Sequence, residues 1–322
     1  MDKMNVKKIL SVITNQRAVL AIVITLIVVA FNNNNFFTIY NMKTMLTTSS
    51  IYLIIGFGAT IVLVAGGVDL SIGFNMSVSG VLAVYLMNNN VPISLAVLCA
   101  LIFGGIVGAI NGYIVVYQKT EPFIITLGMG ISLLGLGRLI TNARPIVAEN
   151  KAFLNISNGM IFGERLNLIY FTIIMFAVVH YILRYTSFGR NLYAIGGDYE
   201  VAEYSGINVR ANKFYAFVLS GVIAALGGVL LASKFGTGNA NYGLTTGFVI
   251  YSAVVVGGTS FAGGIGSVPR SAIGLIFVYG VLQNAMNMLR VNSYTQMVMT
   301  GIIIATVIAL DSYSRKRIRE KV

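Results

Sequence analysis

Residues Phe188–Asn208 read FGRNLYAIGGDYEVAEYSGIN, which is the longest polar passage between two apolar runs of the chain. The pair Gly196–Gly197 interrupts it, and Asp198 can then accept hydrogen bonds from the free N–H groups of a first helical turn. Glu200 follows where the positive end of the helix dipole favours an acid. Gly206 can adopt the left-handed conformation that ends a helix. The passage therefore predicts a short, capped helix.

The predicted helix, Tyr199–Ser205, is too short to be stable alone in water, so it needs a surface to dock against. An ordinary surface loop with one helical turn is the alternative. Apolar runs enclose the passage and basic residues surround it, which is typical of a cytoplasmic loop in a membrane protein; the basic residues are Arg184, Arg190, Arg210 and Lys213. We therefore predict that residues 184–213 carry a docking helix for a cytoplasmic partner.

The composition is that of a membrane protein. Of 322 residues, 57% are hydrophobic and 10% are charged, whereas a soluble domain carries about a quarter charged residues. The net charge of +12 would suggest nucleic acid in a soluble protein. Here the basic residues cluster at the ends of apolar runs, so we expect them to set topology and contact anionic lipids, with no nucleic acid bound. The single cysteine, Cys99, lies in an apolar run, so neither a disulfide nor a metal site is expected.

Ten apolar segments approach the length of about 20 residues that a membrane span needs. They are 18–32, 45–65, 71–88, 93–117, 123–141, 167–183, 214–233, 248–260, 271–289 and 295–310. No small-residue cleavage site follows the first, so we expect it to remain as a span. The eighth is short and is expected to be a broken helix. We predict an all-α polytopic membrane protein of about ten helices, with residues 1–322 as one transmembrane domain.

The distribution of Lys and Arg predicts the orientation. With the N-terminus inside, 15 of the 22 basic residues lie on the inner side, including a basic tail over residues 311–322. The other 7 lie outside or at outer ends, and they are Lys43, Arg138, Arg144, Lys151, Arg165, Lys234 and Arg290. Both termini are therefore expected in the cytoplasm. The loop 142–166 is expected outside, either to meet a partner or as an idle connection.

Residues Ala65–Gly73 read AGGVDLSIG. Gly66 and Gly67 are expected to break one helix, and Asp69 to cap the next, whose first turn holds Ser71. A carboxylate near membrane depth is costly, so Asp69 is also a candidate for a solute pathway. Capping and a pathway role both remain open here.

Residues Gly257–Gly266 read GGTSFAGGIG and form a second glycine-rich break that faintly resembles the first. Thr259 and Ser260 offer hydroxyls, and both breaks fall on the cytoplasmic side of the predicted topology. The stretch is no phosphate-binding P-loop, because no Lys follows in the GK[ST] order.

No enzyme site is visible. His180 lies near the inner end of the sixth span, where an interfacial histidine and a proton relay both remain open. The sequence contains no HExxH, no GxSxG and no paired intramembrane carboxylates. We therefore expect neither catalysis nor a cofactor in this chain.

Together, AGGVDLSIG, FGRNLYAIGGDYEVAEYSGINV and AVVVGGTSFAGGIGSV closely resemble, in order and spacing, the permease subunits of bacterial ABC importers for monosaccharides of the ribose, xylose and galactose/methyl-galactoside type. The similarity runs from about Asn35 to Asp311. It implies about ten spans working as a dimer with a second copy or paralogue. It also implies a separate cytoplasmic ATPase that binds ATP and Mg²⁺, and an extracytoplasmic sugar-binding protein.

The resemblance implies roles for the two kinds of segment. The loop matching Gly197–Ile207 would be the coupling segment that contacts the ATPase, and GGVDLS would lie near the translocation core. The coupling candidates are Gly197, Asp198, Glu200, Ala202, Glu203, Ser205 and Gly206. The translocation-core candidates are Gly66, Gly67, Asp69, Ser71, Gly257, Gly258, Thr259 and Ser260.

Two stretches depart from the family pattern. The family commonly has an acidic pair, ELDAIAA, before VVVGG, whereas this chain has GFVIYSA, with Gly247 and Val249 in place of the acids. After GGIGSV the family usually continues with Gly-Thr, and here Pro269-Arg270-Ser271 follows. These differences bear on which solute is carried, and related proteins import autoinducer-2.

We predict the transmembrane subunit of an ATP-driven importer of a small sugar, in a bacterial cell membrane and working by alternating access. One alternative is a stand-alone transporter coupled to protons or sodium, but intramembrane acids are scarce. Another is a membrane scaffold that transports nothing, but such a protein would have no need of spans interrupted by glycines.

Overall fold

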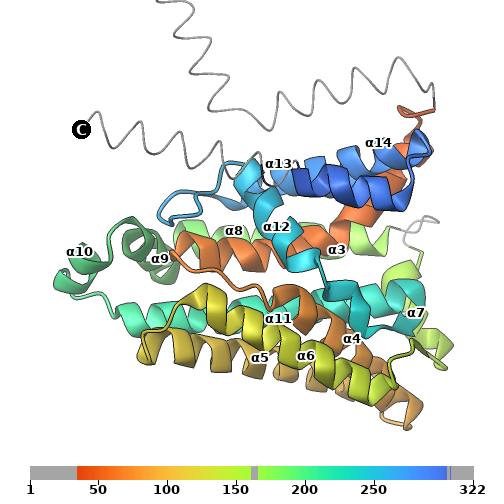
Figure 1. Ribbon diagram of the computed structural model, residues 1–322, viewed down its shortest axis with the longest axis horizontal. Helices are drawn as coiled ribbons and strands as arrows, with labels where there is room; N and C mark the ends of the chain where they lie inside the picture. Colours follow the sequence, from red (N-terminus) through yellow and green to blue (C-terminus); the bar gives the residue numbers. More distant parts are fainter. Residues whose placement is uncertain (1–34, 161–165, 303–304, 306–322) are drawn as a thin grey trace, which may run out of the picture.

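The computed structural model describes residues 35–160, 166–302 and 305. The first predicted span, the end of the tenth and the basic tail lie outside the described residues. Within them the chain is almost wholly helical (Figure 1), with one pair of two-residue strands. The prediction of an all-α polytopic membrane protein is confirmed, whereas the number of ten spans stays a prediction.

Six helical segments of the described chain are long and apolar enough to cross a membrane. They are α3 (Ile39–Val64), α5 (Ile93–Tyr117), α6 (Pro122–Thr141), α8 (Asn167–Tyr185), α11 (Val209–Phe235) and the run Val268–Met288. That run joins α13 (Val268–Leu275), a π-helical stretch (Ile276–Leu282) and α14 (Gln283–Met288). Two apolar helices are shorter, namely α4 (Ile72–Asn88) and α12 (Thr246–Val256), and a 3₁₀ turn (Ala240–Gly243) precedes α12. The eighth predicted span is therefore short, as expected.

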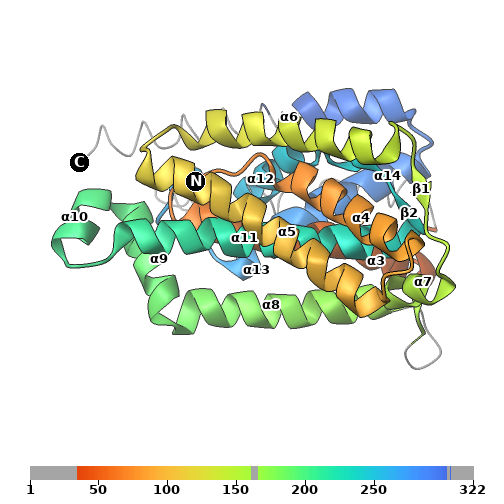
Figure 2. The ribbon, with the colours of Figure 1, turned by 90° about the horizontal axis from the view of Figure 1, so that it is seen from below.

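α11 lies at the centre of the bundle, against α3, α4 and α5 (Figure 2). Glycines allow this packing, because a Cβ on Gly221 of α11 would overlap the Gly104 carbonyl of α5. Small residues are the usual means of close helix approach in lipid, where no hydrophobic force draws helices together. α6 and α8 expose most of their apolar residues, as expected of helices that face lipid.

The two ends of the bundle differ. α9 (Ser187–Gly197) and α10 (Tyr199–Tyr204) lie at one end, and α7 (Lys151–Asn158) lies at the other (Figure 1). Beside α7, strands β1 (Ile146–Val147) and β2 (Thr237–Gly238) pair antiparallel.

Within the loop predicted over residues 142–166, the described residues 142–160 include strand β1 and helix α7. Phe153 of α7 is fully buried, and the Ser157 hydroxyl donates to the Leu230 carbonyl of α11 at 2.7 Å. α7 is a short amphipathic helix that the Asn-rich composition of the loop did not indicate.

Candidate functional site: a glycine junction beneath the docking helix

The first predicted break ends α3 by a specific backbone motif. The N–H of Gly66 donates to the Leu63 carbonyl at 2.9 Å, and the N–H of Gly67 donates to the Val62 carbonyl at 3.0 Å. These two bonds form a Schellman motif, which needs a residue at positive φ, and Gly66 has φ +71°. The predicted helix break is therefore confirmed, and the backbone itself requires its glycine.

The second break ends α12 in the same way. The N–H of Gly258 donates to the Val255 carbonyl at 2.9 Å, and the N–H of Thr259 donates to the Val254 carbonyl at 3.3 Å, with Gly258 at φ +102°. The faint resemblance between the two glycine-rich stretches thus reflects one shared way of ending a helix.

The two breaks and the end of α9 meet in backbone contact. We call this contact the glycine junction and define it as Gly66, Gly196, Gly197, Gly263 and Gly264. The Gly264 N–H donates to the Val64 carbonyl at 3.0 Å. A Cβ on Gly263 would lie 2.7 Å from the Gly66 Cα, and a Cβ on Gly264 would lie 2.8 Å from the Gly197 Cα. A movement of α9 would therefore be transmitted directly to the end of α3 and to the loop that follows α12, because these backbones touch without side chains between them.

Asp69 lies just beyond the first break and is 1% exposed. Its Oδ1 accepts from the Ser71 hydroxyl at 2.6 Å, from the Ser71 N–H at 3.0 Å and from the Asn111 amide at 3.3 Å. Its own N–H donates to the Tyr251 hydroxyl at 2.8 Å. Because Asn111 is on α5 and Tyr251 is on α12, the network fastens the break to two further helices.

The prediction that Asp69 is the N-cap of the next helix is wrong in position. α4 begins at Ile72 and its N-cap is Ser71, whose side chain makes no capping bond. The carboxylate still satisfies the Ser71 N–H, two residues on, which is the Asx-turn geometry that competes with a cap. Asp69 therefore has a structural role, as an acceptor for the turn before α4 and not as the N-cap of that helix. Its role in a solute pathway stays a prediction.

A hydroxyl chain joins the second break to two helices. Thr259 is buried and shares a hydrogen bond with the Ser271 hydroxyl of α13 at 3.0 Å, and Thr60 of α3 donates to the same hydroxyl at 2.8 Å. The Ser260 N–H donates to the Ile265 carbonyl at 2.7 Å and closes the loop. Ser271 belongs to the Pro269-Arg270-Ser271 stretch, so this stretch supplies the bridging hydroxyl.

α10 is the predicted docking helix, and both of its caps are confirmed. Asp198 Oδ1 accepts from the Val201 N–H at 3.0 Å. Gly206, at φ +79°, donates its N–H to the Glu203 carbonyl at 3.0 Å in a third Schellman motif. The helix ends at Tyr204, one residue before the predicted end.

α10 lies at the tip of the bundle with most of its side chains outward (Figure 1). Ala202 alone is buried, in a small cluster with Ile195 of α9 and Val209 of α11. Its exposed side includes acids and apolar groups, namely Tyr199, Glu200, Val201, Glu203, Tyr204 and the adjacent Ser205. Tyr204 is 89% and Val201 is 61% exposed, so α10 leaves apolar side chains uncovered at the tip of the bundle.

The expected interruption at Gly196–Gly197 falls one residue later. α9 continues through Gly197, and the chain leaves the helix at Asp198. A Cβ on Gly197 would meet nothing within 4 Å, whereas a Cβ on Gly196 would overlap the Val64 carbonyl. The candidates chosen from the sequence therefore included Gly197 but not the more tightly packed Gly196. A Gly-Gly pair does not indicate which of its two residues will be closely packed.

Sequence reasoning also missed both side chains that fasten Asp69. Asn111 lies inside an apolar run, where a polar residue is a usable signal because it is costly in lipid. Tyr251 lies in GFVIYSA, the stretch without the acidic pair, so this chain places a phenol there that contacts Asp69. Within the described residues, no three His, Cys, Asp or Glu side chains gather in a way that would hold a metal ion.

Residues 41–307 match the family model described as "Branched-chain amino acid transport system / permease component". The chain is 35% identical to the ribose import permease protein RbsC of Haemophilus influenzae, over 92% of this chain and 93% of that protein. It is 33% identical to the galactose/methyl galactoside import permease protein MglC of Escherichia coli, over 98% of this chain and 100% of that protein.

A third similar protein is the D-allose transport system permease protein AlsC of Escherichia coli, 33% identical over 86% of this chain and 84% of that protein. No solved structure matches the chain. The family match covers the described helices from α3 to α14, including both breaks and α10. The chain therefore belongs to the permease-component family of transport systems, as a multi-pass helical membrane protein.

Proposed function

We propose that this chain is the permease subunit of an ATP-driven importer for a monosaccharide of the ribose, galactose or allose class. The observation that carries the proposal is the similarity, over most of both chains, to import permeases named for ribose, galactose and allose. Phosphoryl chemistry then belongs to a separate cytoplasmic ATPase, and solute capture to an extracytoplasmic binding protein.

The glycine junction supports a mechanism for coupling. ATP-driven closure of the ATPase would displace α10, which is fixed to α9 and α11 by the cluster around Ala202. At the junction α9 contacts the end of α3 and the loop that follows α12, so its displacement would move both of these segments together. Tightly packed helix contacts deform little, so helices that shift usually pass from one packed arrangement to another. The junction therefore favours two alternative arrangements of the helices, as alternating access requires.

In this mechanism Asp69 and Thr259 would hold the moving segments to the neighbouring helices. Their hydrogen bonds connect the breaks to α5, α12 and α13. In this proposal the candidates in both breaks, Gly66, Gly67, Ser71, Gly257, Gly258 and Ser260 included, shape the inner gate of the pathway.

The test is reconstitution in liposomes with the ATPase and binding protein that copurify with the chain. We expect ATP hydrolysis that rises when ribose, galactose or allose is added with the binding protein. Stimulation by autoinducer-2 alone would move the substrate to that alternative. Solute uptake by the chain alone on a proton or sodium gradient would overturn the ATP-driven proposal.

A further inference from the structure

A cavity of about 320 Å³ lies between the end of α8, the start of α9 and the loop before α13. Its volume falls at the lower end of the range of small-ligand sites, about 300–1,000 Å³. Its lining is His180, Leu183, Arg184, Arg190, Tyr193, Gly266, Ser267 and Val268. The consecutive helices α8 and α9 thus meet a loop about 70 residues further along the chain around one small, partly open space of mixed polar and apolar lining, at the same end of the bundle as α10 (Figure 1).

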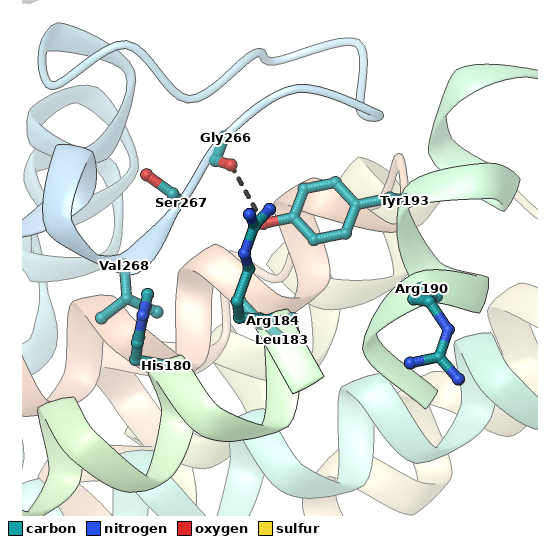
Figure 3. Close-up of a pocket in the computed structure, with 8 residues that line it drawn as sticks. All are labelled: His180, Leu183, Arg184, Arg190, Tyr193, Gly266, Ser267 and Val268. Carbon is teal, nitrogen blue, oxygen red and sulfur yellow. Dashed lines mark hydrogen bonds between the residues drawn. The ribbon is translucent and has the colours of Figure 1, made fainter. Parts of the chain in front are cut away.

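Positive charge converges on this cavity. Figure 3 shows the Arg184 side chain extending from α8 toward the Tyr193 hydroxyl and the Gly266–Ser267 backbone. Burial raises the pKa of the Tyr193 hydroxyl, and the positive charges of Arg184 and Arg270 oppose that rise. Arg190 lines the cavity from α9.

The arginine charges are not neutralised by the described part of the chain. Among residues 35–160 and 166–302, neither Arg184 nor Arg190 forms an ion pair with a carboxylate. The Arg190 Nη1 donates only to the Tyr185 carbonyl, at 3.3 Å. Two such guanidinium groups on the lining of a partly open cavity are suited to a phosphate group, which Arg binds with two parallel hydrogen bonds.

The neutral lining groups suit the same ligand. The Tyr193 hydroxyl donates to the Gly266 carbonyl at 3.0 Å (Figure 3), and this bond ties α9 to the loop before α13. α13 begins at Val268, so the N-terminal end of this helix, with the positive end of its dipole, borders the cavity at Ser267 and Val268. His180 completes the polar lining on the α8 side.

We propose that this cavity binds a phosphate group, carried either by an anionic phospholipid headgroup or by a free phosphate compound. The bound group would join α8, α9 and the loop before α13. That loop and the end of α9 both contribute to the glycine junction, so occupancy would stiffen the connection between α10 and the breaks. The proposal goes beyond transport, because binding is expected whatever solute is carried.

The test uses the purified full chain in a neutral detergent, with two arms. In the lipid arm, native mass spectrometry measures binding of phosphatidylglycerol against phosphatidylcholine, which carries a compensating positive charge. In the soluble arm, inorganic phosphate is added against chloride at equal ionic strength, and the rise in apparent Tm is measured. We expect specific binding in at least one arm.

Four variants locate the site. Arg184→Gln and Arg190→Gln are expected to weaken binding about tenfold each, because each removes a charge-assisted hydrogen bond. Arg184→Lys keeps the charge and is expected to retain part of the affinity. Arg210→Gln is the matched control, since Arg210 is equally exposed at the same end but lies outside the cavity. Size-exclusion profiles and the Tm without ligand show that each variant folds.

Each outcome decides the proposal. Loss in the lipid arm only, confined to the cavity variants, identifies a phospholipid as the source, and loss in the soluble arm only identifies a free phosphate compound. Absence of specific binding in both arms overturns the proposal. An equal loss in Arg210→Gln also overturns it, because binding would then depend on overall charge.

Discussion

At the residue scale, the adjacent glycines Gly196 and Gly197 differ in how closely their backbones are packed. Gly196 lies against the Val64 carbonyl with no room for a methyl group, whereas Gly197 has open space where a Cβ would point. Both are helical residues of α9, so an alanine costs neither of them a strained backbone.

We expect Gly196→Ala to push α9 away from the α3 terminus and to lower the stability by about 1–3 kcal/mol, the usual cost of overpacking. Gly197→Ala is the matched control and should leave the stability near that of the unmodified chain. The apparent Tm of both variants in detergent is the measurement. A similar loss in the two would show that the junction is looser than described.

Asp69 is the second residue-scale test, because it is a buried carboxylate held by neutral donors. Asp69→Asn keeps an acceptor oxygen for the Ser71 hydroxyl and N–H. Asp69→Ala leaves those donors and the Asn111 amide without that acceptor, at a cost of about 1–3 kcal/mol. We therefore expect the alanine variant to have the lower Tm and the greater loss of transport.

Transport measurements distinguish two roles of Asp69, namely holding its neighbours by hydrogen bonds and supplying a negative charge. If both variants fold and both lose transport completely, the negative charge itself is needed, and the fastening role would be insufficient. Intermediate transport in Asp69→Asn, with near-normal Tm, supports the role derived from its hydrogen bonds.

At the element scale, α10 depends on its caps, because six residues cannot form a stable helix alone. Gly206→Pro removes the N–H that donates to the Glu203 carbonyl and excludes the positive φ of this position. We expect the protein to reach the membrane normally but to lose sugar-stimulated ATP hydrolysis in reconstituted complexes.

Gly206→Asn is the control for that prediction, since Asn tolerates the left-handed conformation better than other side chains and nothing lies within 4 Å of its Cβ. It should keep most of the stimulation. Unchanged stimulation in Gly206→Pro would contradict a coupling role for α10.

At the scale of the whole molecule, the testable property is orientation. Gln118 lies in the loop from α5 to α6, at the α10 end, and Glu149 lies in the loop before α7, at the other end; both are exposed (Figure 1). With the native Cys99 replaced by Ala, a cysteine at Glu149 should react with a membrane-impermeant maleimide in spheroplasts. A cysteine at Gln118 should react only after permeabilisation. The reverse pattern would invert the predicted topology and place α10 outside the cell.

Composition and local pattern determined much of this protein. Long apolar runs force helices, because lipid offers the backbone no hydrogen-bonding partners. Glycines at fixed offsets end those helices, so both breaks and the caps of α10 were predictable from AGGVDLSIG, GGTSFAGGIG and IGGDYEVAEYSGIN. These features depend on neighbours within about five residues, which the sequence displays directly.

Only the tertiary structure decided which of these local features meet. The contact of Gly66 with Gly263, the bond of Asp69 to Tyr251 and the cavity between Arg184 and Gly266 each join residues more than 80 positions apart. Neither glycine spacing nor hydropathy encodes such pairings, because they depend on how helices pack around α11. The sequence by itself therefore specified the helices, their breaks and the capped helix α10, whereas helix packing decided how α10 and α9 are connected to the breaks.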